Sequence, residues 1–100
     1  MVDEIEKSLR SARMAVFLVT QDFLNSQFIQ AQEVPMLLKR ADSEGVRIVW
    51  IAVKASTVMD HFLSQYQAAN DPKVPLEALT EAQLNQALID IYSKIKAAVA

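Results

Sequence analysis

Two apolar runs constrain the fold of this sequence more than any other feature. They are MAVFLVT at residues 14–20 and VRIVWIAV at residues 46–53, both rich in β-branched and aromatic side chains. A continuous apolar run of this length is typical of a strand buried on both faces, as in a parallel sheet covered by helices. Parallel strands need a long crossover connection, and residues 21–45 are long enough to form one. The sequence therefore predicts an α/β protein.

The segments around these runs carry helix signals. We expect a helix over residues 26–44, preceded by turn and capping residues in QDFLNS and ended by Gly45, the only glycine in the chain. The resulting strand–helix–strand unit is expected to be right-handed. A short amphipathic helix is expected before the first strand, because apolar residues recur there at helical spacing: Val2, Ile5, Leu9 and Ala12.

The C-terminal half has a less regular pattern. Residues 58–69 predict a helix, and NDPKVP predicts a loop that Pro72 and Pro75 interrupt. LEAL, at residues 76–79, is compatible with a short edge strand or with none. Thr80 and Gln83 then form a capping-box pattern. They precede apolar residues at helical spacing, which predict a terminal helix docked on the sheet: Leu84, Leu88, Ile91, Ile95 and Val99.

Composition excludes several classes of function. The net charge is -2 and the ten basic residues are scattered, so there is no electrostatic footprint for nucleic acid. The absence of cysteine excludes a disulfide framework, a thiolate zinc site and a cysteine nucleophile, and no metal cluster or bound cofactor is expected. The charged N-terminus lacks a signal-peptide segment, and no apolar run approaches about twenty residues. These features predict one soluble, cytoplasmic domain over residues 1–100, without a membrane partner.

The predicted sheet is incomplete. Two strong strands and one doubtful strand cannot protect both edges of a sheet, and the run at residues 14–20 is too apolar to lie open to water. We expect its outer edge to be covered by another chain or by the N-terminal helix. An α/β chain also normally begins with a strand, whose carboxyl-end loop contributes to the ligand crevice, whereas this sequence begins with helical spacing.

The run EIEKSLRSARMAVFLVTQDFLNSQFIQAQEVPMLLKRADSEGVRIVWIAV, followed by YQAANDPKVPLEAL, resembles the C-terminal two-thirds of a bacterial TIR (Toll/interleukin-1 receptor) domain. The most specific parts are AVFLVTQDFLNSQFI, QEVPMLL and YQAANDP with the following PL. Complete members have a flavodoxin-like, three-layer fold with five parallel strands. Their first strand, first helix, second strand and the long loop over the nucleotide site have no counterpart here. The resemblance thus implies a partial TIR-like domain, truncated at the N-terminus.

The resemblance also implies a site. In enzymatically active TIR domains, a glutamate on the helix after the third strand is essential for cleaving the nicotinamide–ribose bond of NAD, and Glu33 matches it. Thr20, Phe23, Phe28 and Ile29 are then the implied substrate-binding residues, with NAD as substrate. Many active relatives carry tryptophan four residues before the glutamate, where this sequence has Ile29. A carboxylate beside the ribose can stabilise oxocarbenium charge, and nicotinamide leaves as a neutral ring without a general acid.

Each candidate also has a purely structural interpretation. Glu33 is equally compatible with a solvated position favoured by the helix macrodipole, and Pro35 with a kink or the true start of the helix. His61, the only histidine, lies beside Phe62 and favours a partly buried or surface imidazole over a catalytic or metal role. The remaining candidates fit the core (Trp50), helix faces packed on the sheet (Tyr66 and Tyr92) and a solvated face (Lys39, Asp42 and Glu44).

Three classes of function therefore stay open. The first is a TIR-type NAD glycohydrolase in bacterial immunity or signalling, and the second is a non-catalytic TIR-like module that acts through homotypic association. The third is an unrelated flavodoxin-like or receiver-like domain, which is disfavoured because neither strong strand ends in the acidic cluster of a receiver. Without a glycine-rich loop, neither a Walker site nor a Rossmann fingerprint is present. We expect these hundred residues alone to turn over NAD poorly or not at all, because other walls of the site are not encoded.

Overall fold

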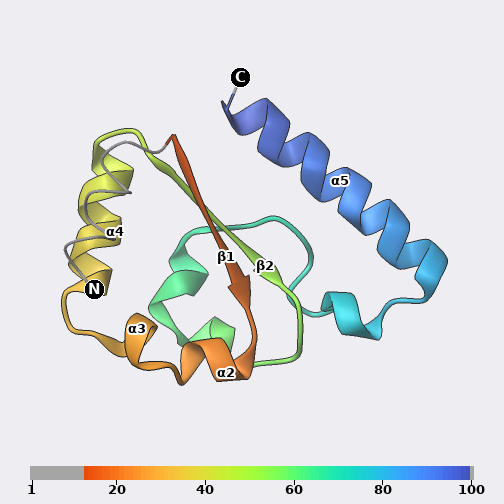
Figure 1. The fold of residues 1–100 in the computed structure, drawn as a ribbon, viewed down its shortest axis with the longest axis horizontal. Helices are drawn as coiled ribbons and strands as arrows, with labels where there is room; N and C mark the ends of the chain where they lie inside the picture. Colours follow the sequence, from red (N-terminus) through yellow and green to blue (C-terminus); the bar gives the residue numbers. More distant parts are fainter. Residues whose placement is uncertain (1–12, 100) are drawn as a thin grey trace.

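The chain has a mixed α/β fold with a three-stranded parallel sheet at its centre, in the order β1-β2-β3 (Figure 1). The structure is a computed structural model that describes residues 13–99. Strand β1 (Met14–Val19) pairs along its whole length with β2 (Arg47–Ala52), and β2 pairs with the two-residue β3 (Gln67–Ala68). The predicted strands and their parallel pairing are confirmed, but the predicted burial of β1 on both faces is wrong, because Val16 and Leu18 are 39% and 61% exposed. The helix expected at the N-terminus, with Val2, Ile5, Leu9 and Ala12, lies outside the described residues.

Strand β2 separates two apolar cores. Successive side chains of a strand point to opposite faces. Ile48, Trp50 and Ala52 therefore belong to one cluster, and Val49 and Ile51 belong to another on the opposite face. All five residues are buried, as the sequence predicts for a strand covered on both sides. Helices α4 (Val34–Ser43) and α5 (Glu81–Val99) accordingly lie on opposite sides of the strands (Figure 1).

The larger core lies under α4 (Val34–Ser43). Its buried residues Val34, Leu38 and Ala41 pack in one cluster with Trp50 of β2. The indole Nε1 of Trp50 donates a hydrogen bond to the carbonyl of Tyr66 at 3.0 Å, which pairs the one polar atom of a buried ring. Trp50 is therefore a core residue, as predicted.

The helix predicted over residues 26–44 is wrong in its extent. The chain forms three helices instead: α2 (Gln21–Leu24), α3 (Gln27–Gln30) and α4. Ser26 separates the first two, because its hydroxyl donates to the Phe23 carbonyl at 2.7 Å and accepts from the Ile29 amide at 3.5 Å. Pro35 lies in the first turn of α4, where a missing amide hydrogen is harmless, and so marks the true start of this helix. Gly45 ends it with a φ of +94°, as predicted.

The helix predicted over residues 58–69 is also wrong. Two 3₁₀ helices, η1 (Val58–Asp60) and η2 (Phe62–Gln65), precede β3 in this segment. His61 is extended between them and its ring nitrogen Nδ1 accepts the Leu63 amide at 3.2 Å, so it caps η2 and interrupts a continuous helix. LEAL forms a third 3₁₀ helix, η3 (Leu76–Ala78), and no strand.

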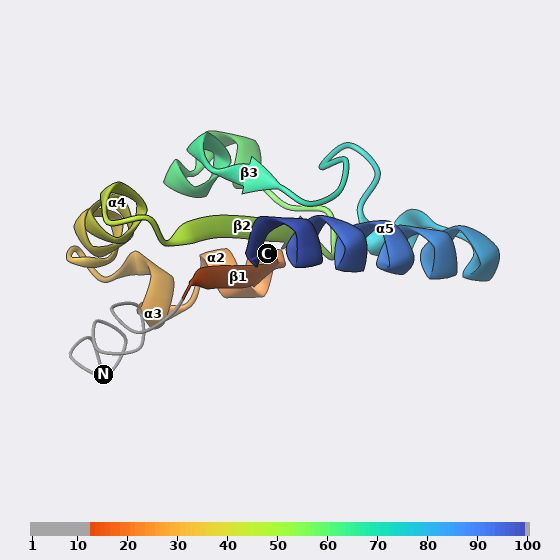
Figure 2. The same ribbon diagram turned by 90° about the horizontal axis from the view of Figure 1, so that it is seen from above.

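The terminal helix α5 (Glu81–Val99) forms and docks as predicted. Its capping box is complete, because the Gln83 amide donates to Thr80 Oγ1 at 3.2 Å and the Thr80 amide donates to Gln83 Oε1 at 3.0 Å. Buried Ile91 joins the second core. The first half of α5 extends beyond the strands (Figure 2). Tyr92, predicted to pack on the sheet, is instead 63% exposed.

Neighbouring positions on α4 test the packing of the larger core. Leu38→Ala should lower the free energy of unfolding by about 2–5 kcal/mol, because it leaves a cavity where a 1% exposed side chain is packed. Met36→Ala, at a 68% exposed position, should change that free energy by less than about 0.5 kcal/mol. Denaturant unfolding followed by Trp50 fluorescence measures both. Equal losses in the two variants would contradict this arrangement of α4.

Candidate functional site

The substrate-binding residues that the TIR resemblance implies begin at the carboxyl end of β1. Thr20 directly follows the strand and caps α2, its Oγ1 accepting the Phe23 amide at 3.0 Å. The ring of Phe23 then contacts those of Phe17 and Phe28, with centroid distances of 5.9 and 6.1 Å. Open α/β sheets bind ligands at the carboxyl ends of their strands. The structure thus brings Thr20, Phe23 and Phe28 together at the appropriate end of β1.

The other two implied residues have different surroundings. Ile29 is 1% exposed and packs in the larger core, so in this conformation its side chain is not available to a substrate. Glu33 is exposed and directly precedes α4, and its side chain makes no capping hydrogen bond to that helix. Its carbonyl accepts the Leu37 amide at 2.9 Å. Both a substrate-facing carboxylate and a solvated one near a helix N-terminus fit this position.

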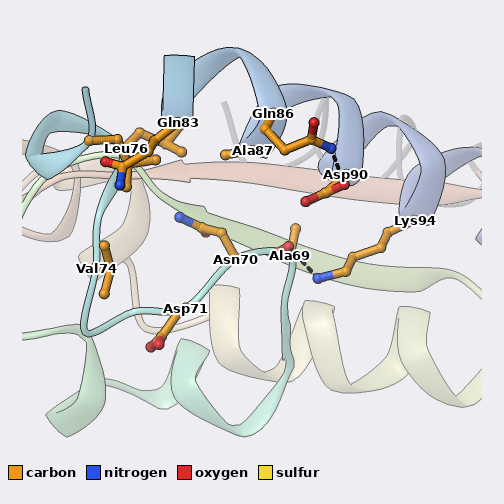
Figure 3. Close-up of a pocket in the computed structure, with 11 residues that line it drawn as sticks. Ala69, Asn70, Asp71, Val74, Leu76, Gln83, Gln86, Ala87, Asp90 and Lys94 are labelled. Atoms are coloured by element: carbon orange, nitrogen blue, oxygen red, sulfur yellow. Dashed lines mark hydrogen bonds between the residues drawn. The ribbon is translucent and has the colours of Figure 1, made fainter. Parts of the chain in front are cut away.

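A cavity that sequence reasoning missed lies between α5 and the loop after β3 (Figure 3). Its volume is about 350 Å³, within the range of small-molecule sites. The catalytic and substrate-binding residues that the TIR resemblance implies do not line it: Glu33, Thr20, Phe23, Phe28 and Ile29. The lining combines an apolar part with amide and charged groups: Ala69, Asn70, Asp71, Val74, Leu76, Leu79, Gln83, Gln86, Ala87, Asp90 and Lys94.

Most polar side chains around this cavity already have partners. Lys94 Nζ donates to the Ala69 carbonyl at 2.9 Å, and Gln86 Nε2 donates to Asp90 Oδ1 at 3.0 Å (Figure 3). Asn70 makes two bonds to one residue of β2, since its Oδ1 accepts the Ala52 amide at 2.8 Å and its Nδ2 donates to the Ala52 carbonyl at 3.0 Å. Lys94 therefore holds α5 to the loop after β3, and Asn70 holds that loop to β2, whereas the bond between Gln86 and Asp90 lies within α5.

Asn70 is the residue in this region with the clearest structural role, and the turn residues of NDP are its only sequence signal. An asparagine side chain carries both a donor and an acceptor, as a backbone peptide does. It therefore extends β2 by a pair of hydrogen bonds without adding a strand.

Substitution of Asn70 tests this attachment. Asn70→Ala should lower the free energy of unfolding by about 1–3 kcal/mol, because two partly buried backbone groups of Ala52 lose their partner. Asn70→Asp should also destabilise, since its carboxylate keeps the acceptor but faces the Ala52 carbonyl without a donor. Asn85→Ala, at an exposed position on α5, is the control and should be neutral or slightly stabilising. A silent Asn70→Ala variant in denaturant unfolding would refute this role.

A second cavity, of about 390 Å³, lies near the amino end of β2. Its lining includes Asp42, Arg47 and Tyr66. Burial, and secondly the nearby charge of Asp42, raise the pKa of the Tyr66 hydroxyl above its usual value. The cavity lies at the end of the sheet opposite to the one where open α/β folds bind ligands, and it contains none of the implied site residues.

His61 has a structural environment. Its ring lies 4.3 Å from that of Phe62, and Nδ1 accepts the Leu63 amide. Desolvation lowers the pKa of the imidazole below its ordinary value of 6.5. No group of three or more His, Cys, Asp or Glu residues within the described part of the chain could hold a metal ion.

His61 should make stability depend on pH. Because its pKa is lowered in the folded state, its contribution is present above pH about 6.5 and is lost as the pH falls through the lowered folded value. Protonation of Nδ1 also removes the acceptor for the Leu63 amide. The free energy of unfolding should therefore fall as the pH is lowered below about 6.5. In His61→Asn, whose Oδ1 can accept the same amide without titrating, this fall should be smaller. If the free energy of unfolding of His61→Asn had the same pH dependence as that of the unmodified chain, His61 would not be the source of the pH dependence.

Comparison of the chain with protein-family models, curated proteins and solved structures gives no significant match. Within the described residues, no helix has the length and apolar character needed to cross a membrane.

Proposed function

We propose that this chain is part of a TIR-like, flavodoxin-type domain of the NAD glycohydrolase class, acting in bacterial immunity or signalling, with Glu33 as the catalytic carboxylate. The observation that supports this proposal is the position of Glu33. It is exposed at the start of α4, the helix that returns the chain from β1 to β2, and it follows a segment in which Phe23 and Phe28 are in contact. Its carboxylate is available to solvent and makes no capping bond to α4.

Cleavage of the nicotinamide–ribose bond requires two things of the protein: this carboxylate and groups that hold NAD. As the nicotinamide–ribose bond breaks, positive charge develops on the ribose, and a fixed carboxylate beside the sugar stabilises it. The leaving nicotinamide is neutral, so no acid is needed to protonate it. The rings of Phe23 and Phe28 are apolar surfaces that can contact a flat ring of the substrate.

The same geometry supports the proposal that these hundred residues are inactive alone. Glu33 lines neither of the two cavities described above, and Ile29 is buried. A carboxylate without groups that position the substrate loses most of its value, since orientation contributes up to about 7–11 kcal/mol of a barrier. The missing walls correspond to the front third that the TIR resemblance implies for a complete domain.

Nicotinamide release from NAD tests both parts of this proposal. The hundred-residue chain should release nicotinamide no faster than its Glu33→Gln variant. A longer natural chain that adds the front third should hydrolyse NAD and lose that activity in Glu33→Gln, with its fold unchanged, because the side chain is exposed. Asp22→Asn, which removes another exposed carboxylate of the same region, is the matched control and should retain activity. Full activity of Glu33→Gln in the longer chain would rule out this catalytic role.

A second candidate function is a non-catalytic TIR-like module that acts through homotypic association. The exposure of Val16 and Leu18 on β1, at 39% and 61%, favours it, because apolar side chains on an edge strand are suited to contact with another chain. The two functions separate experimentally. A purely associative module keeps its biological effect in Glu33→Gln, whereas an NAD glycohydrolase loses it.

A further inference from the structure

The cavity between α5 and the loop after β3 combines an apolar end with a charged end. Its volume is about 350 Å³, and all the residues that line it lie between residues 69 and 94, within the described part of the chain. Glu33 does not line it, so this cavity is separate from the proposed NAD site. An apolar cavity with a few convergent polar groups is the usual form of a small-molecule site.

The apolar end is formed mainly by the segment that follows the loop. Val74, Leu76 and Leu79 line it from this segment, and Ala87 lines it from α5. Val74 is 43% exposed, and the side chains of Leu76, Leu79 and Ala87 are half-buried. Figure 3 shows Val74 and Leu76 away from the charged side chains of α5. This end therefore offers apolar surface that a ligand side chain can cover.

The charged end carries one carboxylate and one ammonium group, from Asp90 and Lys94 of α5. Residues four apart on a helix are neighbours, and opposite charges at this spacing often pair. Here they form no ion pair with each other, because each is bonded elsewhere. Asp90 Oδ1 accepts from Gln86 Nε2 at 3.0 Å, and Lys94 Nζ donates to the Ala69 carbonyl at 2.9 Å (Figure 3). The two charges thus line the cavity separately.

Both charged groups keep unused hydrogen-bonding capacity. A carboxylate has two acceptor oxygens and an ammonium has three donors, and within the described residues one of each has a partner. The other polar groups nearby are less available. Asn70 is bonded to Ala52 through both side-chain polar atoms. Asp71 Oδ1 accepts the Lys73 amide at 2.9 Å, and its carboxylate points away from Asp90 (Figure 3).

We propose that this cavity binds a free α-amino acid with an apolar side chain. The ligand's ammonium group bonds to the carboxylate of Asp90, and its carboxylate accepts from the ammonium group of Lys94. Hydrogen bonds between charged groups are the strong ones. The ligand's side chain lies against Val74, Leu76 and Leu79. An ammonium and a carboxylate on one carbon atom match two opposite charges that lie one helical turn apart.

The pair of charges favours a free amino acid over the end of a peptide. A peptide C-terminus has a carboxylate without an adjacent ammonium group, and a peptide N-terminus has the reverse. Either would leave Asp90 or Lys94 without an opposite charge. The volume also favours one amino acid, because about 350 Å³ is near the lower limit for small-molecule sites.

Titration with L-leucine tests this site by a measurement that does not involve NAD. Amide chemical shifts should change around the cavity and saturate in the millimolar range or below. Glycine, N-acetyl-leucine and leucinamide lack the apolar side chain, the ammonium group and the carboxylate respectively. Each should bind about tenfold more weakly than leucine, or weaker still.

Three results of this titration overturn the proposal. The first is that leucine, methionine and phenylalanine all fail to bind. The second is that N-acetyl-leucine binds as well as leucine, which would indicate a peptide C-terminus. The third is that leucinamide binds as well as leucine, which would indicate a peptide N-terminus or a simple amine.

Substitution of Asp90 tests which group holds the ammonium. Asp90→Asn should weaken leucine binding about tenfold, because the amide still accepts from Gln86 Nε2 but carries no charge. It should leave the affinity for N-acetyl-leucine unchanged. Asp60→Asn, which removes an exposed carboxylate that lines neither cavity, is the matched control and should bind leucine normally. Lys94 is tested by leucinamide and not by substitution, because it also holds α5 to the loop.

Circular dichroism and Trp50 fluorescence check that both variants fold. Equal leucine affinity of Asp90→Asn and the unmodified chain overturns the role of Asp90. Equal weakening by Asp60→Asn also overturns it, because the effect would then come from net charge and not from this cavity.

Discussion

Residues Ile48 to Ala52 are all buried because the helices after β1 cover one face of β2 and α5 covers the other. The position of each remaining element depends on this strand. Strand β1 pairs with it along six residues, β3 pairs with its middle, and Asn70 binds its last residue through two hydrogen bonds. The two cores lie on opposite faces of this strand, so β2 contributes buried side chains to both.

The two faces of the sheet are covered to different degrees. On the side of α4, buried residues from several helices form one cluster that includes Trp50. On the side of α5, a smaller cluster centres on Ile91 and leaves Val16 and Leu18 of β1 in solvent. Apolar area in solvent is a free-energy penalty that association can remove, at about 25 cal/mol per Å² buried. The exposure of these two side chains is the observation that favours the second candidate function.

Neighbouring residues in the sequence determine where Glu33, the candidate catalytic residue, lies relative to the helices. Pro35 fixes the start of α4 and Ser26 separates α2 from α3, so Glu33 lies at a helix boundary and not within a long helix. A boundary position exposes the carboxylate, whereas a position on the inner side of a helix would bury it. The chemical role of this carboxylate is part of the proposed function, whereas its exposure is a feature of the structure.

The sequence by itself determined the features that depend on neighbouring residues: the two strands, the end of α4 at Gly45, the capping box of Thr80 and Gln83, and the core position of Trp50. Only the tertiary structure decided which face each residue occupies. Burial of Ile29, exposure of Leu18 and Tyr92, and the pairing of Asn70 with Ala52 all depend on elements far apart in the chain. The 3₁₀ helices around His61 belong to the same group, because the burial of Val58 and Leu63 beneath the sheet outweighs local helical periodicity.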